Sequence, residues 1–109
     1  MFSPIHRALG VEPGDLTIDL LEQAVQAGVR ESENLDWKES LYETQNPKWR
    51  EEAAKDIAAM ANSGGGWLVF GVRDEDDAAA GLSPVPWSGA EKQRLRQVAY
   101  AHIGPARKQ

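Results

Sequence analysis

Residues 55–74, which read KDIAAMANSGGGWLVFGVRD, decide the fold of this chain. Strong helix formers fill residues 55–61. Asn62 and the three glycines that follow it end this helix, because Gly and Asn tolerate the left-handed conformation found at helix C-termini. Residues 67–72 are short and almost wholly apolar, which predicts a strand buried on both faces. The rest of the chain has to cover that strand.

The segments before this stretch predict an arm, a helix and a strand. Residues 1–14 contain prolines and glycines and are expected to form an irregular N-terminal arm. Residues 16–27 have the apolar spacing of a one-sided helix, with Asp15 or Thr17 as the cap and a glycine after its end. Residues 34–39 alternate between apolar and charged side chains, as a strand with one buried face does.

Two further helices complete the expected elements. Asn46 and Pro47 have the character of an N-cap and a first helical residue, so the helix that ends at Asn62 is expected to begin there. Residues 88–91 have the spacing of a capping box that opens a third helix, which Gly104 and Pro105 end. Its expected apolar stripe is Leu95, Val98, Ala99, His102 and Ile103.

The order of these elements predicts an α/β or α+β fold: a single small mixed-sheet domain, residues 1–109, with three helices. Two long strands alone make a poor sheet. Three completions stay open. The arm and the 78–87 loop add short strands, or strand edges pair between chains, or the chain is a piece of a longer one.

Composition sets outer limits on function. The 109 residues include no cysteine, which rules out disulfides and thiolate chemistry and is in keeping with a cytoplasmic location. The sequence has neither a signal-peptide pattern nor an apolar run long enough to span a membrane, so we expect no membrane association.

The net charge of −5 is unevenly distributed. From residue 88 onward five basic residues stand against Glu91, a balance of +4, which leaves −9 for residues 1–87. This basic end is interpreted either as a solvated face and tail or as an edge that contacts nucleic-acid phosphates. The residues concerned are Lys92, Arg94, Arg96, Arg107 and Lys108.

Four charged residues form the candidate reactive site. Asp36 and Lys38 project from one face of the first strand, Glu31 precedes that strand, and Asp74 follows the buried one. If the two strands are neighbours, these side chains converge at one end of the sheet. Three carboxylates, Glu31, Asp36 and Asp74, suit a hard cation such as Mg²⁺ or Mn²⁺, and Lys38 can offset charge on a phosphate. The alternative is a surface strand with a cross-strand ion pair.

The same residues belong to a longer set of motifs. In order these are Glu31, the LDWKES run at 35–40, the Ala-Asn helix end at 61–62, the glycines leading into a strand that ends Gly-Val at 71–72, and the Gly-Leu pair at 81–82. This combination, which covers about half of the chain, resembles the Schlafen/AlbA-like domain family.

The resemblance implies a mixed α/β domain that acts on nucleic acid, either RNA or DNA. In animal Schlafen proteins such domains form a metal-dependent endoribonuclease that cuts tRNA and rRNA. Their acidic site corresponds to Glu31, Asp36 and Asp74 here, with Lys38 beside them. Asp36 stands where the family more often has glutamate, which keeps the charge and shortens the reach by one methylene.

The resemblance leaves other functions open. Many bacterial relatives are described as DNA-binding or regulatory domains, so the alternatives are a non-catalytic nucleic-acid-binding module and an interaction domain with a vestigial acidic site. The family domain usually continues past the third helix into further strands. We therefore expect a minimal or shortened domain with an open sheet edge, and a homodimer formed through that edge.

Overall fold

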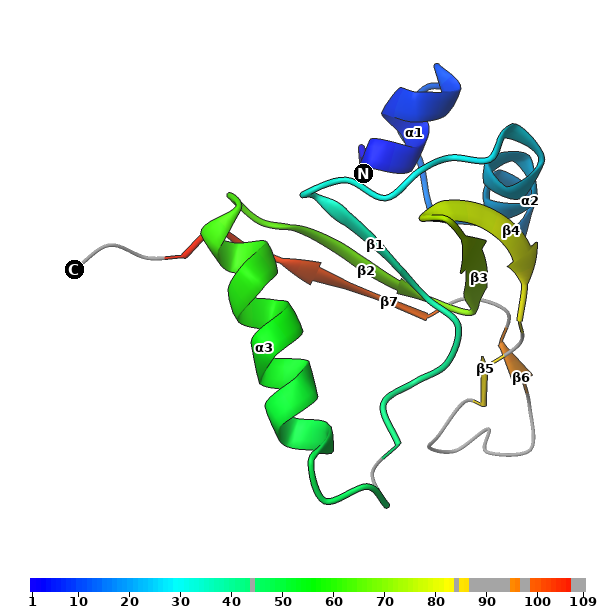
Figure 1. Ribbon diagram of the computed structural model, residues 1–109. Helices are drawn as coiled ribbons and strands as arrows, with labels where there is room; N and C mark the ends of the chain where they lie inside the picture. The colour runs from blue at the N-terminus through cyan, green and yellow to red at the C-terminus, as the bar shows by residue number, and fades with distance from the viewer. Residues whose placement is uncertain (44, 84, 87–94, 97–98, 107–109) are drawn as a thin grey trace.

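The computed structural model describes residues 1–43, 45–83, 85–86, 95–96 and 99–106, and the elements found in them form a small α+β domain with three helices and mixed sheets (Figure 1). The helices are α1 (Pro4–Leu9), α2 (Ile18–Ala27) and α3 (Trp49–Asn62). The strands are β1 (Leu35–Lys38), β2 (Gly66–Phe70), β3 (Val72–Glu75), β4 (Ala78–Leu82), β5 (Val85–Pro86), β6 (Leu95–Arg96) and β7 (Ala99–Ile103).

A three-stranded sheet in the order β1-β2-β7 lies at the centre of the domain. β1 and β2 are parallel and joined through α3, whereas β7 runs antiparallel to β2. Every residue of β2 is buried, as its apolar run predicts. Two antiparallel pairs, β3-β4 and β5-β6, stand beside this sheet. The described part of the 78–87 loop therefore adds strands, as one of the three completions expects, whereas the arm that this completion also includes adds none.

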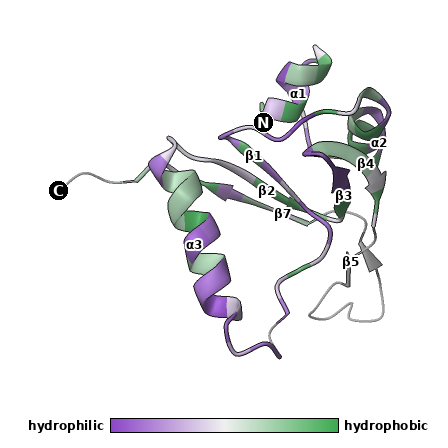
Figure 2. Ribbon diagram, in the orientation of Figure 1, coloured by the Kyte–Doolittle hydropathy of each residue, from purple (hydrophilic) through white to green (hydrophobic). Residues whose placement is uncertain are grey.

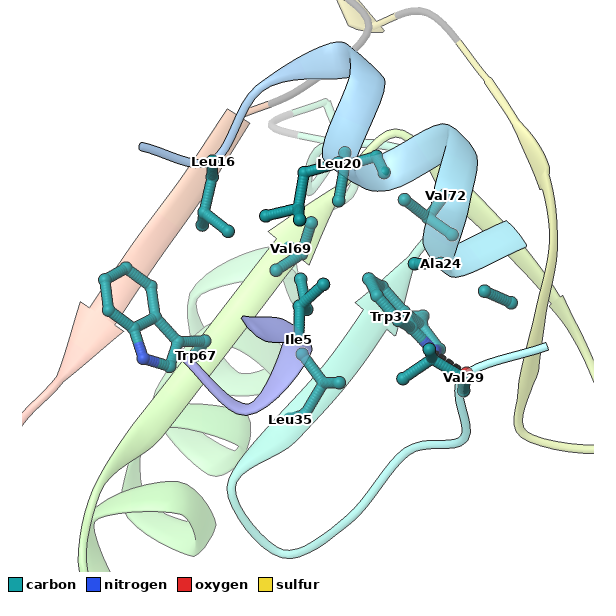
Figure 3. Packing of buried hydrophobic residues seen from close by; sticks show 12 residues of the cluster. Ile5, Leu16, Leu20, Ala24, Val29, Leu35, Trp37, Trp67, Val69 and Val72 are labelled. Carbon is teal, nitrogen blue, oxygen red and sulfur yellow. Dashed lines mark hydrogen bonds between the residues drawn. The ribbon is translucent and has the colours of Figure 1, made fainter. Parts of the chain in front are cut away.

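The central sheet has a separate apolar cluster on each face. The larger cluster joins α1, α2, β3 and β4 to one face, and the indole nitrogen of Trp37 donates a hydrogen bond to the Val29 carbonyl at 2.9 Å within it (Figure 3). On the other face Leu68 and Phe70 pack with Met60 of α3. The N-terminal half of α3 is mostly hydrophilic (Figure 2). The sheet is therefore anchored to α3 mainly through the C-terminal end of that helix.

The predicted irregular arm over residues 1–14 is wrong, because a capped helix begins at Pro4. The Ser3 hydroxyl accepts hydrogen bonds from the amides of Ile5 and His6, and the His6 ring nitrogen accepts one from the Ser3 amide. Histidine thus takes the place that glutamate or glutamine usually has in a capping box. Full burial of Ile5 fixes this short helix against the core.

The predicted third helix is also wrong within the described residues, since residues 99–103 form β7. Ala99, Ala101 and Ile103 are half-buried, whereas Tyr100 and His102 are exposed, and this two-residue alternation is that of a strand. β2 is apolar on both faces and needs a neighbour on its second edge, which β7 supplies. The expected start of the helix, residues 88–94, lies outside the described residues.

The other predicted elements are present, with shifted boundaries. α2 has Thr17 as its N-cap and a left-handed Gly28 at its end, as expected. α3 begins at Trp49, two residues later than expected, and the Asn46 side chain accepts a hydrogen bond from the Lys48 amide in the turn before it. The apolar run predicted as one strand is divided at Gly71, whose φ of 101° separates β2 from β3.

Candidate functional site

Two backbone groups, one in the β3-β4 turn and one in β1, hold Glu31 in place. Its amide donates to the Asp77 carbonyl at 2.7 Å, and its carboxylate accepts from the Trp37 amide at 3.1 Å. The neighbouring Arg30 forms a bridge with Ala78 at the start of β4. The loop that carries Glu31 is therefore tied to the turn between β3 and β4.

Glu31, Asp74 and Asp77 form an acidic triad whose carboxylate oxygens lie within 4.8 Å of one another. Asp76 and Asp77 have positive φ values of 49° and 68°, which make the connection between β3 and β4 a tight turn. This turn brings Asp77 back beside Asp74 and Glu31. The sequence predicts Glu31 and Asp74 from their places next to strands, but it does not single out Asp77, whose only signal is its place in the acidic run at 74–77.

Like charge and burial act together on Glu31. Burial raises the pKa of its carboxyl group most, the hydrogen bond from the Trp37 amide lowers it in part, and Asp36 and Asp74 raise it further, to about 7. Asp36 is thus close enough to Glu31 to affect its protonation, although it is not one of the three mutually close carboxylates. At neutral pH this carboxyl group is close to half-protonated unless a cation is present.

Lys38 lies between two carboxylates on the face of β1 that looks toward α3. Its ammonium is 3.4 Å from Asp36 and 3.0 Å from Asp56, and Asp56 accepts a hydrogen bond from the Tyr42 hydroxyl at 2.7 Å. Asp36, Lys38, Asp56 and Tyr42 therefore form one polar network that joins β1, α3 and the segment between them. Sequence reasoning missed Asp56 and Tyr42, because neither lies on a strand end.

Each shifted pKa in this network has a physical cause. Burial lowers the pKa of Lys38, but Asp56 and Asp36 together outweigh it and the pKa is raised. Burial raises the pKa of Asp56, but the hydrogen bonds from Tyr42 and Lys38 outweigh it and the pKa is lowered. Burial, and then Asp56, raise the pKa of Tyr42. Lys38 is therefore a fixed cation and Tyr42 a neutral hydroxyl at neutral pH.

Two hollows flank this network and share Asp56. One of about 280 Å³ lies between Glu31, Asp36 and the C-terminal half of α3. The other, of about 580 Å³, is lined by Lys38, Tyr42 and the N-terminal half of α3. Together they form an open surface that passes Glu31, Asp36 and Lys38.

The predicted basic edge cannot be placed beside this site. Lys92, Arg94, Arg107 and Lys108 lie outside the described residues, and Arg96 belongs to β6 without a described side chain. Nucleic-acid contact through these five residues stays a prediction.

The fold and the site define a class: a small α+β domain with carboxylates gathered beside a parallel strand pair. The chain belongs to the family described as Schlafen, AlbA_2, whose model matches residues 31–106. The match begins at Glu31 and continues through β7, so it covers the acidic triad and the whole central sheet. Membership indicates a nucleic-acid-related domain. Searches of curated proteins and of solved structures gave no match.

Within the described part of the chain, no helix has both the length and the apolar character needed to cross a membrane.

Proposed function

We propose that this domain is a divalent-cation-dependent nuclease that cuts structured RNA such as tRNA. The observation that carries the proposal is the acidic triad of Glu31, Asp74 and Asp77, with oxygens within 4.8 Å of one another. Family membership supports nucleic acid as the partner. The absence of cysteine is in keeping with a reducing cytoplasm, where such a substrate is found.

The donor set fits the expected cation. Three carboxylates supply only hard oxygen ligands, which Mg²⁺ and Mn²⁺ prefer. Burial, and then the neighbouring Asp36 and Asp74, raise the pKa of Glu31, and a cation between the carboxylates would favour its charged form. Such an ion supplies a more acidic bound water and neutralises charge on a phosphoryl oxygen.

The remaining residues of the site have separate roles. Lys38 keeps 28% of its side-chain surface exposed, so its ammonium can contact a phosphate at the mouth of the hollow. Asp56 and Tyr42 position Lys38 by holding it against α3. Asp36 places a negative charge between Glu31 and Lys38, and so links the acidic triad to the lysine.

The test is cleavage of end-labelled tRNA with Mn²⁺ or Mg²⁺, compared with the same reaction in EDTA. Asp74→Asn/Asp77→Asn should lower the cleavage rate by about a hundredfold or more, because it removes two of the three charged oxygen ligands. Asp76→Asn is the matched control, since it lies in the same turn, is exposed and is outside the triad.

Two results would contradict the nuclease proposal. One is equal cleavage by the wild type and the double variant, which would place the activity elsewhere. The other is tRNA binding by the wild type without any metal-dependent cleavage. That second result would favour the non-catalytic binding module, and absence of both binding and cleavage would favour the interaction domain.

A further inference from the structure

A third hollow lies on the other side of the loop that carries Glu31. It has a volume of about 520 Å³ and lies between α1, the 30–35 segment, the glycine turn before β2, and β7. Ser32 and Leu35 line both this hollow and the 280 Å³ hollow beside Glu31 and Asp36. The two hollows are therefore separated only by the thickness of that loop. A strand of nucleic acid that passes Glu31 can therefore reach both.

The charge of this hollow is opposite to that of the acidic triad. Arg7, Arg30 and His102 line it, and its described lining contains no carboxylate. Within the described part of the chain neither arginine forms a salt bridge, and Arg7 lies over the Phe2 ring at 5.7 Å. In a chain of net charge −5, two arginines without a carboxylate partner mark a place for an anion.

Aromatic rings form one wall of the hollow. The rings of Trp67 and His102, which both line it, are 4.6 Å apart between centroids and inclined by 30°. The Tyr100 ring, which is outside the lining, lies 5.5 Å from that of Trp67. Trp67 is almost buried, whereas His102 and Tyr100 are exposed on β7. Such a row of rings is a surface on which nucleic-acid bases stack.

The glycine turn shapes the hollow but does not bind phosphate through its first two amides. The Gly64 and Gly65 amides donate to carbonyls at the end of α3. The Gly65 carbonyl accepts a hydrogen bond from the Asn34 side chain at 2.7 Å, which fixes the turn against the 30–34 loop. An anion in this hollow is therefore recognised by arginine side chains rather than by a phosphate-binding loop.

We propose that this hollow holds one unpaired nucleotide of the nucleic acid whose neighbouring phosphodiester lies at the acidic triad. Arg7 and Arg30 contact its phosphate, and its base stacks on His102. The proposal rests on the proposed function for the position of the cut bond. The nucleotide site itself is defined by the hollow, its charge and its aromatic wall.

The experiment measures binding of a fluorescein-labelled single-stranded adenine hexanucleotide, in ribose and deoxyribose forms, by anisotropy in EDTA so that no cleavage occurs. Arg7→Ala/Arg30→Ala should weaken binding by about tenfold and reduce the slope of log affinity against log salt by about 0.7, the value for one phosphate that is no longer neutralised on a single strand. Lys48→Ala/Arg50→Ala is the control, because it removes the same charge from exposed positions outside the hollow.

A second measurement tests the base rather than the charge. His102→Ala should weaken binding by about tenfold with little change in the salt slope, because stacking releases no counterions. In the wild type, addition of adenosine monophosphate should shift the imidazole proton resonances of His102 and leave those of the buried His6 in place.

The outcomes separate this inference from the proposed function. Equal loss of binding in the arginine variant and its control, or unmoved His102 resonances, would overturn the nucleotide site even if tRNA is cut. Binding that depends on Arg7, Arg30 and His102 in a wild type that cuts nothing would support the site and overturn the nuclease. Preference for the ribose hexanucleotide would assign the site to RNA.

Discussion

Partial burial and two neighbouring aspartates both raise the pKa of the Glu31 carboxyl group. The hydrogen bond from the Trp37 amide favours the charged form but does not offset them, so the pKa is raised from 4.5 to about 7. Between these two values the folded state binds more protons than the unfolded state. Stability therefore falls as the pH rises through this window.

Glu31→Gln should abolish that pH dependence, because the amide keeps an acceptor for Trp37 and carries no charge. Above pH 7 the variant should be more stable than the wild type by about 1 kcal/mol, after allowance for solvent screening of a partly exposed group. Below pH 4.5 the two should unfold alike. The measurement is urea denaturation without divalent cations at both ends of this range.

Glu33→Gln is the control for this prediction, since Glu33 is exposed and lies in the same loop. A stabilisation by Glu31→Gln that is the same at low and high pH would contradict the explanation. It would mean that the variant improves packing rather than relieving repulsion.

Among the individual site residues, those next to predicted strands could be identified from the sequence. Those that tertiary contacts bring into the site could not. Glu31 precedes β1 and Asp74 follows the apolar run in the sequence, which a strand assignment can anticipate, and the hydrogen bond from the Glu31 amide to the Asp77 carbonyl holds the two segments together. Asp77 needs two successive positive φ values in the β3-β4 turn, and Asp56 needs the exact rotation of α3 over β1. Neither follows from spacing alone.

Among the elements, the turn between α3 and β2 is constrained by its glycines. Gly64 and Gly65 both have positive φ, 96° and 93°, but their surroundings differ. A Cβ on Gly64 would meet nothing within 4 Å, whereas one on Gly65 would lie 2.6 Å from the Ile103 carbonyl oxygen of β7. The turn therefore needs a glycine at 65 for space as well as for conformation.

Gly65→Ala should lower the free energy of unfolding by about 3 kcal/mol, and Gly64→Ala by about 1 kcal/mol, because only the first adds a backbone clash to the cost of a left-handed alanine. Urea denaturation of the two variants measures the difference directly. Equal losses would show that the end of β7 moves away from the added methyl group without loss of stability. That result would contradict the tight contact between this turn and β7.

The two segments that the sequence misassigned have a common physical origin. α1 is too short to show helical periodicity and depends on the Ser3–His6 cap and the buried Ile5. Residues 99–103 contain helix-favouring alanines, but the unfilled edge of β2 selects the extended conformation. In both segments the local sequence leaves two conformations close in energy, and a tertiary contact selects one of them.

At the scale of the whole molecule, the sheet order leaves β7 at an edge. Within the described residues β7 pairs only with β2, so the backbone groups on its other side are available to a second strand. Its exposed side chains, Tyr100 and His102, are not charged residues of the kind that usually protect an edge. This favours the expected homodimer over an isolated domain.

The dimer prediction follows from that edge. Pairing of β7 with its symmetry mate would extend the central sheet to six strands and place two acidic triads on one continuous surface, where structured RNA can bridge them. Sedimentation velocity should show a dimer whose population rises with protein concentration. Hydrogen exchange should show the outward-facing β7 amides protected only in the dimer, while β2 amides are protected in both states.

A monomer at concentrations where RNA is cut, or outward β7 amides that exchange rapidly in a dimer, would exclude this edge as the interface. If the monomer cuts RNA, one acidic triad has to act alone. If the outward β7 amides of a dimer exchange rapidly, the second copy has to bind at another surface.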